Sequence, residues 1–320
     1  MKKLENMVKR ANWTLLAAVV LFIVMSLVVM LLYRGDDLLR TYSLSALLCS
    51  IGALYVPALL CIGRRDPACF GKVRIRPGQV VLCVVLGVSV LFLSSGINLI
   101  VSYLAESLKL SQSSTVLPDE QGWRVWGSLV TLALIPAVTE EQLFRGLLVS
   151  AYRPLGRKAA VLLSSLLFAL MHGQPLTLVS IFLLGVVMGE LVYESGSMYP
   201  SMIVHFVNNA AIVLLRATLS PSAGAGAASQ TLGAVEMMSA VVTCIVLGLP
   251  AFLACFSRLR ASFRVGSSVV QPEDGPTVEI HYKLTRMPGK DAYEPTPKSA
   301  WVPLALTFML LIALNALALL

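Results

Sequence analysis

The chain has 320 residues, of which 57% are hydrophobic and 13% are charged, and its formal net charge at pH 7 is +8. Soluble domains carry about twice that share of charged residues, so the composition argues against a soluble globular protein. The positive charge does not indicate a nucleic-acid partner, because lysine and arginine are concentrated in alternate connecting segments between apolar runs. That distribution is typical of a polytopic membrane protein and predicts a cytoplasmic N-terminus.

Apolar segments that approach the length of a bilayer crossing recur along the whole chain. A transmembrane helix needs roughly 20 mainly apolar residues. The candidates are residues 13–33, 41–63, 78–104, 125–152, 158–173, 176–194, 198–216, 234–257 and 301–320. We therefore predict an all-α, polytopic helical membrane protein with about nine transmembrane helices.

Composition divides the chain further. We expect three N-terminal helices in residues 1–121, a central segment at 122–216, an outer loop with the eighth helix at 217–257, a polar cytoplasmic segment at 258–300 and a last helix at 301–320. Within the polar segment, residues 277–285 alternate between apolar and polar types as a strand does.

Three ionisable residues interrupt the fourth apolar segment: Glu140, Glu141 and Arg145. Each costs at least ~2.5 kcal/mol at the centre of a bilayer on insertion scales. Glu141 and Arg145 are four residues apart and share a helix face, so we expect a structural ion pair. Glu140 points elsewhere and has no partner on its own helix, which makes it a candidate general base. The alternative is a structural acid bonded to a neighbouring helix.

The fifth segment ends with Phe168 and His172, one helical turn apart. Glu140 and His172 are separated from the turn near Leu155 by similar numbers of residues. An antiparallel helix pair would therefore bring them to nearly equal depth, where they could share one water molecule. The simpler interpretation of His172 is a histidine that caps the end of its helix.

The seventh segment contains His205 and Asn209, four residues apart and on one helix face. Both side chains can donate hydrogen bonds, which suits stabilisation of an oxyanion. The simpler interpretation is a polar hydrogen bond between helices. Counted from the preceding turn, His205 would lie shallower in the membrane than Glu140 and His172, so either the fourth and fifth helices project beyond the membrane on that side or the predicted helix edges are wrong.

Taken together, the motifs E-E-x-x-x-R at 140–145, F-x-x-x-H at 168–172 and H-x-x-x-N at 205–209 resemble the CPBP family. That family comprises CAAX prenyl endopeptidases of the Rce1 type, bacteriocin-processing proteins and related Abi membrane proteins. Each motif is short, but the three occur in order within about 70 residues, each on its own predicted membrane helix. The resemblance covers roughly residues 122–215, under a third of the chain.

The resemblance implies a membrane endopeptidase of the CAAX type, in a prokaryotic plasma membrane, with its catalytic core on predicted helices 4, 5 and 7. Glu140 and His172 would activate the hydrolytic water, and His205 with Asn209 would support the oxyanion. Glu141 and Arg145 would hold the fourth helix in place, and Phe168 would belong to the same supporting shell. The expected partners are membrane lipid and a peptide or protein substrate presented at the membrane, with no nucleic acid.

Three questions stay open at this level. Zinc sites usually combine three protein ligands with a water, and Glu140, His172 and His205 could supply them, although no HExxH motif is present. The metal-free alternative uses Glu140 as the base, with His172 orienting the water. Rival functions are a non-proteolytic immunity or scaffold protein of the same fold and, with less support, a proton-coupled carrier. Neither the prenylation of a substrate nor the oligomeric state follows from the sequence.

Overall fold

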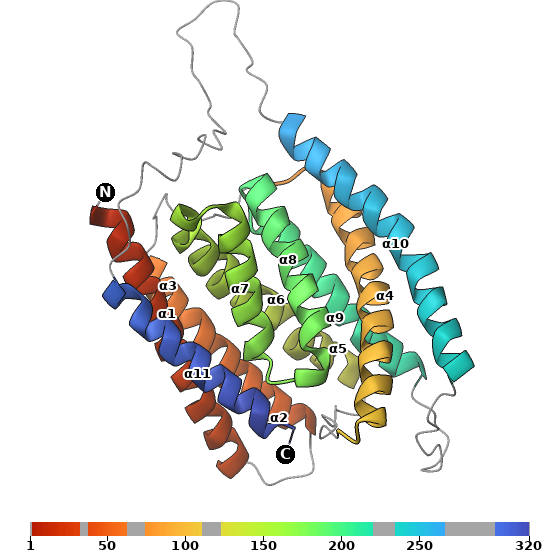
Figure 1. The fold of residues 1–320 in the computed structure, drawn as a ribbon, viewed down its shortest axis with the longest axis horizontal. Helices are drawn as coiled ribbons and strands as arrows, with labels where there is room; N and C mark the ends of the chain where they lie inside the picture. Colours follow the sequence, from red (N-terminus) through yellow and green to blue (C-terminus); the bar gives the residue numbers. More distant parts are fainter. Residues whose placement is uncertain are drawn as a thin grey trace, which may run out of the picture.

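The computed structural model describes residues 2–32, 38–62, 74–110, 123–219, 234–265 and 298–319. Within these ranges the chain is helical and contains no strand (Figure 1). The strand-like stretch 277–285 and most of the predicted outer loop, residues 220–233, lie outside them.

The helices are α1 (Lys2–Leu32), α2 (Leu38–Ser45), η1 (Ala46–Tyr55), α3 (Val56–Ile62), α4 (Pro77–Ser107), α5 (Arg124–Ser128), η2 (Leu129–Leu134), α6 (Ile135–Glu141), η3 (Gln142–Val149), η4 (Arg153–Leu155), α7 (Arg157–Met171), η5 (Pro175–Thr177), α8 (Leu178–Ser195), α9 (Tyr199–Leu219), α10 (Ala234–Val265), η7 (Lys298–Trp301) and α11 (Val302–Leu317). Of these, η1, η2 and η3 are π-helical, and η4, η5 and η7 are short 3₁₀ turns.

Seven helical stretches among the described residues are long and apolar enough to cross a membrane. They are Met7–Leu31, Ser43–Ile62, Pro77–Ser107, Pro175–Ser195, Tyr199–Thr218, Val235–Phe263 and Lys298–Leu317. The other two predicted segments are also helical, but 125–152 carries the charged cluster and α7 has only 15 residues. The all-α, polytopic prediction is confirmed, whereas nine membrane crossings remain a prediction.

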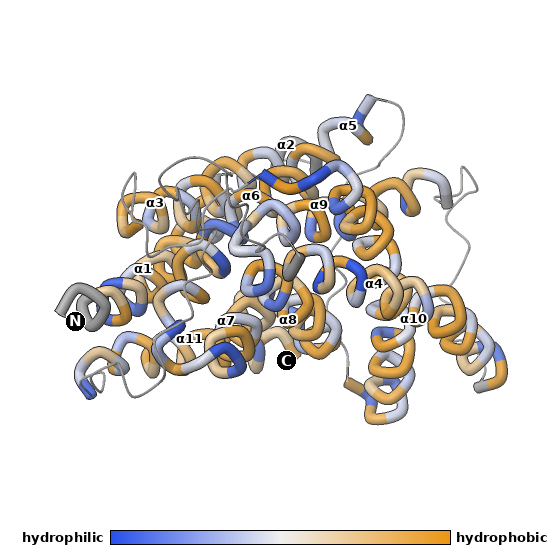
Figure 2. The backbone as a smooth tube through the Cα atoms, turned by 90° about the horizontal axis from the view of Figure 1, so that it is seen from above, coloured by the Kyte–Doolittle hydropathy of each residue, from blue (hydrophilic) through white to orange (hydrophobic). Residues whose placement is uncertain are grey.

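The helices form three groups side by side (Figure 1). Helices α1, α2, α3 and α11 lie on one side, α4 and α10 lie on the other, and α6 to α9 occupy the middle. Many large apolar side chains on α1, α4 and α10 are exposed, and Figure 2 shows hydrophobic residues predominating along α4 and α10. An apolar outer surface of this extent fits contact with lipid.

Two glycines bring α8 against α7. A Cβ atom on Gly185 would lie 3.0 Å from the Cβ of Ser165, and one on Gly189 would lie 2.9 Å from a methyl carbon of Val161. The GxxxG spacing therefore serves close packing between these helices, as small residues do in membrane proteins. The close approach also brings the backbone carbonyl of Gly185 within reach of the charged cluster described next.

Candidate active site

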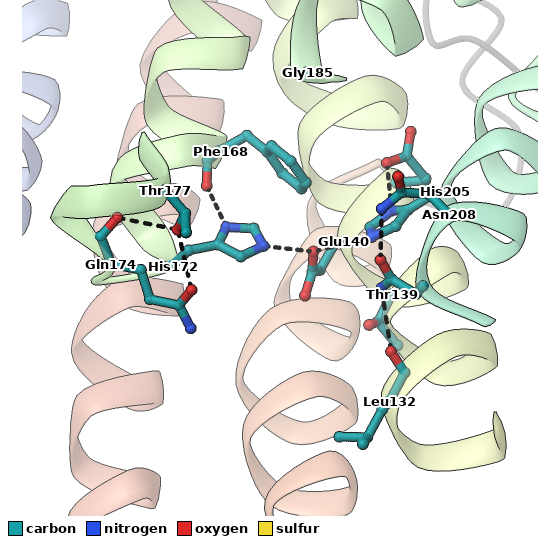
Figure 3. Close-up of polar contacts among 12 residues, drawn as sticks. Leu132, Thr139, Glu140, Phe168, His172, Gln174, Thr177, Gly185, His205 and Asn208 are labelled. Atoms are coloured by element: carbon teal, nitrogen blue, oxygen red, sulfur yellow. Dashed lines mark hydrogen bonds and ion pairs between the residues drawn. The ribbon is translucent and has the colours of Figure 1, made fainter. Parts of the chain in front are cut away.

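Three of the predicted site residues converge on one point. The Oε2 atom of Glu140 lies 4.0 Å from Nε2 of His172 and 3.9 Å from Nε2 of His205 (Figure 3). Glu140 is near the end of α6, His172 follows the last residue of α7, and His205 lies within α9. The side chains of Glu140 and His172 are 17% and 28% exposed, whereas that of His205 is 2% exposed. The site is thus a partly open pair backed by a buried histidine.

Hydrogen bonds assign the tautomers of both histidines. Nδ1 of His172 is 2.8 Å from the carbonyl oxygen of Phe168, and Nδ1 of His205 is 3.0 Å from Oε1 of Glu141. A carbonyl and a carboxylate can only accept, so each Nδ1 must carry a proton. When the rings are neutral, Nε2 of each histidine is a hydrogen-bond acceptor. Both face Oε2 of Glu140, another acceptor, which has no hydrogen-bond partner among the described residues. The arrangement calls for a donor between these atoms.

Glu141 and Arg145 form the predicted ion pair. Their side chains are 0% and 1% exposed, and Arg145 Nη1 donates to Glu141 Oε1 across 3.0 Å. Arg145 Nη2 also donates to the carbonyl of Gly185, at 3.2 Å. The bond from His205 to Glu141 is a connection that the sequence did not indicate, because the prediction treated the ion pair as self-contained. Glu141 instead orients a histidine of the site.

Phe168 contacts both histidines of the site and Arg145 of the ion pair. Its ring is fully buried and meets the rings of His172 and His205 edge to face, with centroids 4.7 and 5.7 Å apart. The guanidinium carbon of Arg145 lies 4.3 Å from its centroid, at a distance that favours a cation–π interaction. Its backbone carbonyl accepts a hydrogen bond from the Nδ1–H of His172. One residue therefore contacts both histidines and the ion pair.

The structure places His205 beside Glu140, although residue counting from the preceding turn gave them different depths. A Cβ on Gly146 would lie 3.0 Å from the sulfur of Met198, just before α9. Residues 197, 198 and 201 are all buried, although Tyr199, the first residue of α9, is exposed. Glu140 lies six residues before Gly146, and His205 lies seven residues after Met198. Along two antiparallel helices, these similar separations bring Glu140 and His205 to the same level.

Asn209 is not among the residues that meet at Glu140. Its amide Nδ2 donates to the carbonyl of Leu132 at 3.1 Å, and its Oδ1 accepts a longer bond from Asn208 at 3.3 Å. Pro136 has no N–H, so the α-helical donor to Leu132 is missing. Asn209 thus donates to a carbonyl that lacks its usual α-helical donor. Its second amide hydrogen remains available, and its oxyanion role stays a prediction.

The residues present do not fit a zinc centre. Ligands placed tetrahedrally around zinc lie about 3.3 to 3.5 Å from one another, whereas Glu140 Oε2 is 4.0 and 3.9 Å from the two imidazole nitrogens. Within the part of the chain that the structure describes, no group of three or more His, Cys, Asp or Glu side chains could hold a metal ion. The metalloprotease interpretation therefore has no support.

Comparison with known proteins identifies the central segment. Residues 122–211 match the family model described as type II CAAX prenyl endopeptidase Rce1-like. Neither a curated protein nor a solved structure matches the chain. The matched residues include Glu140, His172, His205 and Asn209, and they exclude α1 to α4, α10 and α11. The match covers the segment that carries the three motifs, and it supports the resemblance of this segment to the CPBP family of CAAX proteases.

Proposed function

We propose that the protein is an intramembrane endopeptidase that hydrolyses a peptide bond in a membrane-associated peptide or protein. Glu140 and His172 hold and activate the water. The observation that carries this proposal is the convergence of two Nδ1-protonated histidines on an unpaired carboxylate oxygen. The protein works in a prokaryotic plasma membrane, with its N-terminus in the cytoplasm.

A water molecule fits between Glu140 and His172. An oxygen about 2.8 Å from both Glu140 Oε2 and His172 Nε2 subtends an angle of about 90° across their 4.0 Å separation. The water donates one hydrogen to each acceptor, which leaves its lone pairs directed away from the protein groups. That orientation suits attack on a carbonyl carbon presented at the exposed side of the pair.

Hydrolysis then follows ordinary general acid–base chemistry. Glu140 takes one proton from the water while the oxygen bonds to the scissile carbonyl carbon, giving a tetrahedral intermediate. Collapse breaks the carbon–nitrogen bond, and the leaving amine takes the proton from Glu140. One water is consumed, and the products are a carboxylic acid and an amine.

The remaining site residues support this step. The free amide hydrogen of Asn209 is a candidate donor to the oxyanion. His205 donates its Nδ1 hydrogen to Glu141, so it can donate from Nε2 only when it carries a second proton. Arg145 and Glu141 fix the orientation of His205, and Phe168 supports both imidazoles through ring contacts.

A prenylated peptide with a CAAX-type end is the first probe, because the matched family is described as a CAAX prenyl endopeptidase. The purified protein in liposomes would be incubated with an internally quenched farnesylated peptide and with its unprenylated counterpart, in water enriched in oxygen-18. We expect two peptide fragments by mass spectrometry, with the label in the new carboxylate, and no cleavage by His172→Ala.

The comparison of the two peptides shows whether the lipid group is recognised. Cleavage that persists in His172→Ala would contradict the proposed mechanism. Intact peptides in every reaction would contradict the peptidase proposal and favour a non-proteolytic immunity or scaffold role.

A further inference from the structure

Asn315 of the C-terminal helix α11 reaches the helix that ends at His172. Its side-chain Nδ2 donates to the carbonyl of Leu170 at 2.8 Å and to the carbonyl of Leu311, in its own helix, also at 2.8 Å. The residue is 7% exposed. Both amide hydrogens are therefore committed, one within α11 and one to the end of α7.

The bond from Asn315 to Leu170 lies at the C-terminal end of α7. The last carbonyls of a helix have no intrahelical donor and need other partners. Here the Phe168 carbonyl accepts from the His172 ring, that of Ala169 accepts from the His172 N–H, and that of Leu170 accepts from the Gly173 N–H. The Gly173 bond is long, at 3.2 Å. The Asn315 amide is thus the shorter of two bonds to Leu170, two residues before His172.

The other end of α11 is fixed to the Rce1-like domain as well. Asn12 donates to the carbonyl of Ala300 at 2.7 Å, and the Tyr152 hydroxyl donates to Asn12 at 2.7 Å, all among buried groups. The ring of Tyr152 stacks on that of Trp301, which directly precedes α11. Since Tyr152 closes the helix that carries the acidic pair, α11 is joined to both catalytic helices.

We propose that α11 is a positioning element for His172 and that Asn315 is its positioning residue. The amide of Asn315 holds the last turn of α7, and the bond between the Phe168 carbonyl and the His172 ring then fixes the imidazole. This inference rests on the proposed peptidase function, and it assigns a role in catalysis to a helix outside the matched domain.

The test compares Asn315→Leu with Thr307→Val in the full-length protein. Leucine has the same branched skeleton as asparagine with bulkier methyl groups, and it removes both donors. Thr307 is fully buried on the same helix, and its hydroxyl donates to the Pro303 carbonyl of that helix. With the farnesylated quenched peptide, Asn315→Leu should lower kcat about five- to tenfold, the size expected for one lost buried hydrogen bond. KM should not change, and Thr307→Val should stay within twofold of wild type.

An NMR measurement separates positioning from a general structural effect. The chain has three histidines, so the nitrogen NMR signals of histidine-labelled protein can be assigned by substitution. Asn315→Leu should shift or broaden the His172 signals and leave those of His205 in place.

A wild-type kcat for Asn315→Leu would overturn the inference, as would equal changes in the signals of both histidines. The NMR measurement needs no substrate. It therefore tests the inference even if wild-type protein cleaves no peptide and the proposed function itself fails.

Discussion

Replacing Glu141 by glutamine should destabilise the protein far more than the same change at Glu140. Glu141→Gln keeps the size of the side chain but leaves the guanidinium of Arg145, which is 1% exposed, without its counter-charge. Removing one partner of a buried pair costs about 3 to 5 kcal/mol. Arg145 keeps its bond to Gly185 and its contact with Phe168, so we expect about 3 kcal/mol, the lower end.

Glu140→Gln should behave differently. The carboxylate is 17% exposed, and its nearest ionisable partners are histidine nitrogens at 3.9 and 4.0 Å. A substitution with no buried ion pair to break should change stability by less than about 1 kcal/mol.

The assay is reversible denaturant unfolding of purified variants in one detergent. It includes Arg145→Met and the double variant Glu141→Gln/Arg145→Met, which removes both charges. The double variant should lose at least about 2 kcal/mol less stability than the sum of the single variants, because it leaves no unpaired charge. Equal destabilisation by Glu140→Gln and Glu141→Gln, or strict additivity of the pair, would refute the division of the acids into a catalytic and a structural residue.

Three further outcomes are expected. Gly185→Ala should lower the free energy of unfolding by about 1 to 3 kcal/mol, because its Cβ would lie 3.0 Å from Ser165. Gly78→Ala is the matched control, because a Cβ there would have nothing within 4 Å. Equal stability of the two variants would contradict the close packing of α8 on α7. Asn209→Leu should cost about 1 to 3 kcal/mol in the same assay, because it removes a donor to Leu132; an unchanged stability would show that this bond contributes nothing. Zinc chelators should leave peptide turnover unchanged, and a loss that zinc reverses would favour a metal mechanism.

The sequence was sufficient where local geometry determines the outcome. The spacing of Glu141 and Arg145 predicted their ion pair, which the structure shows at 3.0 Å. Helix counting from the turn near Leu155 placed Glu140 and His172 at similar depth, and their side chains lie 4.0 Å apart. Both inferences depend only on helix periodicity and on an antiparallel connection, which a sequence pattern specifies.

The sequence was insufficient where tertiary packing determines the position of a residue. His205 lies beside Glu140, and the close approach of Met198 to Gly146 contributes to this placement, which residue counting along one helix does not indicate. The destination of the Asn209 amide depends on the carbonyl that Pro136 leaves without an α-helical donor. No local pattern indicated either contact, because each joins residues that are far apart in the chain.

Asn315 is a second example of a long-range contact. In the sequence, Asn315 is an isolated polar residue in an apolar segment, and no neighbouring motif indicates its partner. Its bond to Leu170 joins residues 145 positions apart. Only the packing of α11 on α7 reveals that this amide lies beside the catalytic helix end.

The most direct test of the central claim is the turnover of purified Glu140→Gln on the farnesylated quenched peptide, measured beside wild type at equal folded concentration. A glutamine amide cannot take a proton from the water. We therefore predict a fall in kcat of about 10²-fold or more, the range of general-base catalysis, with little change in KM. A Glu140→Gln variant that cleaves the peptide within twofold of the wild-type rate would contradict the account.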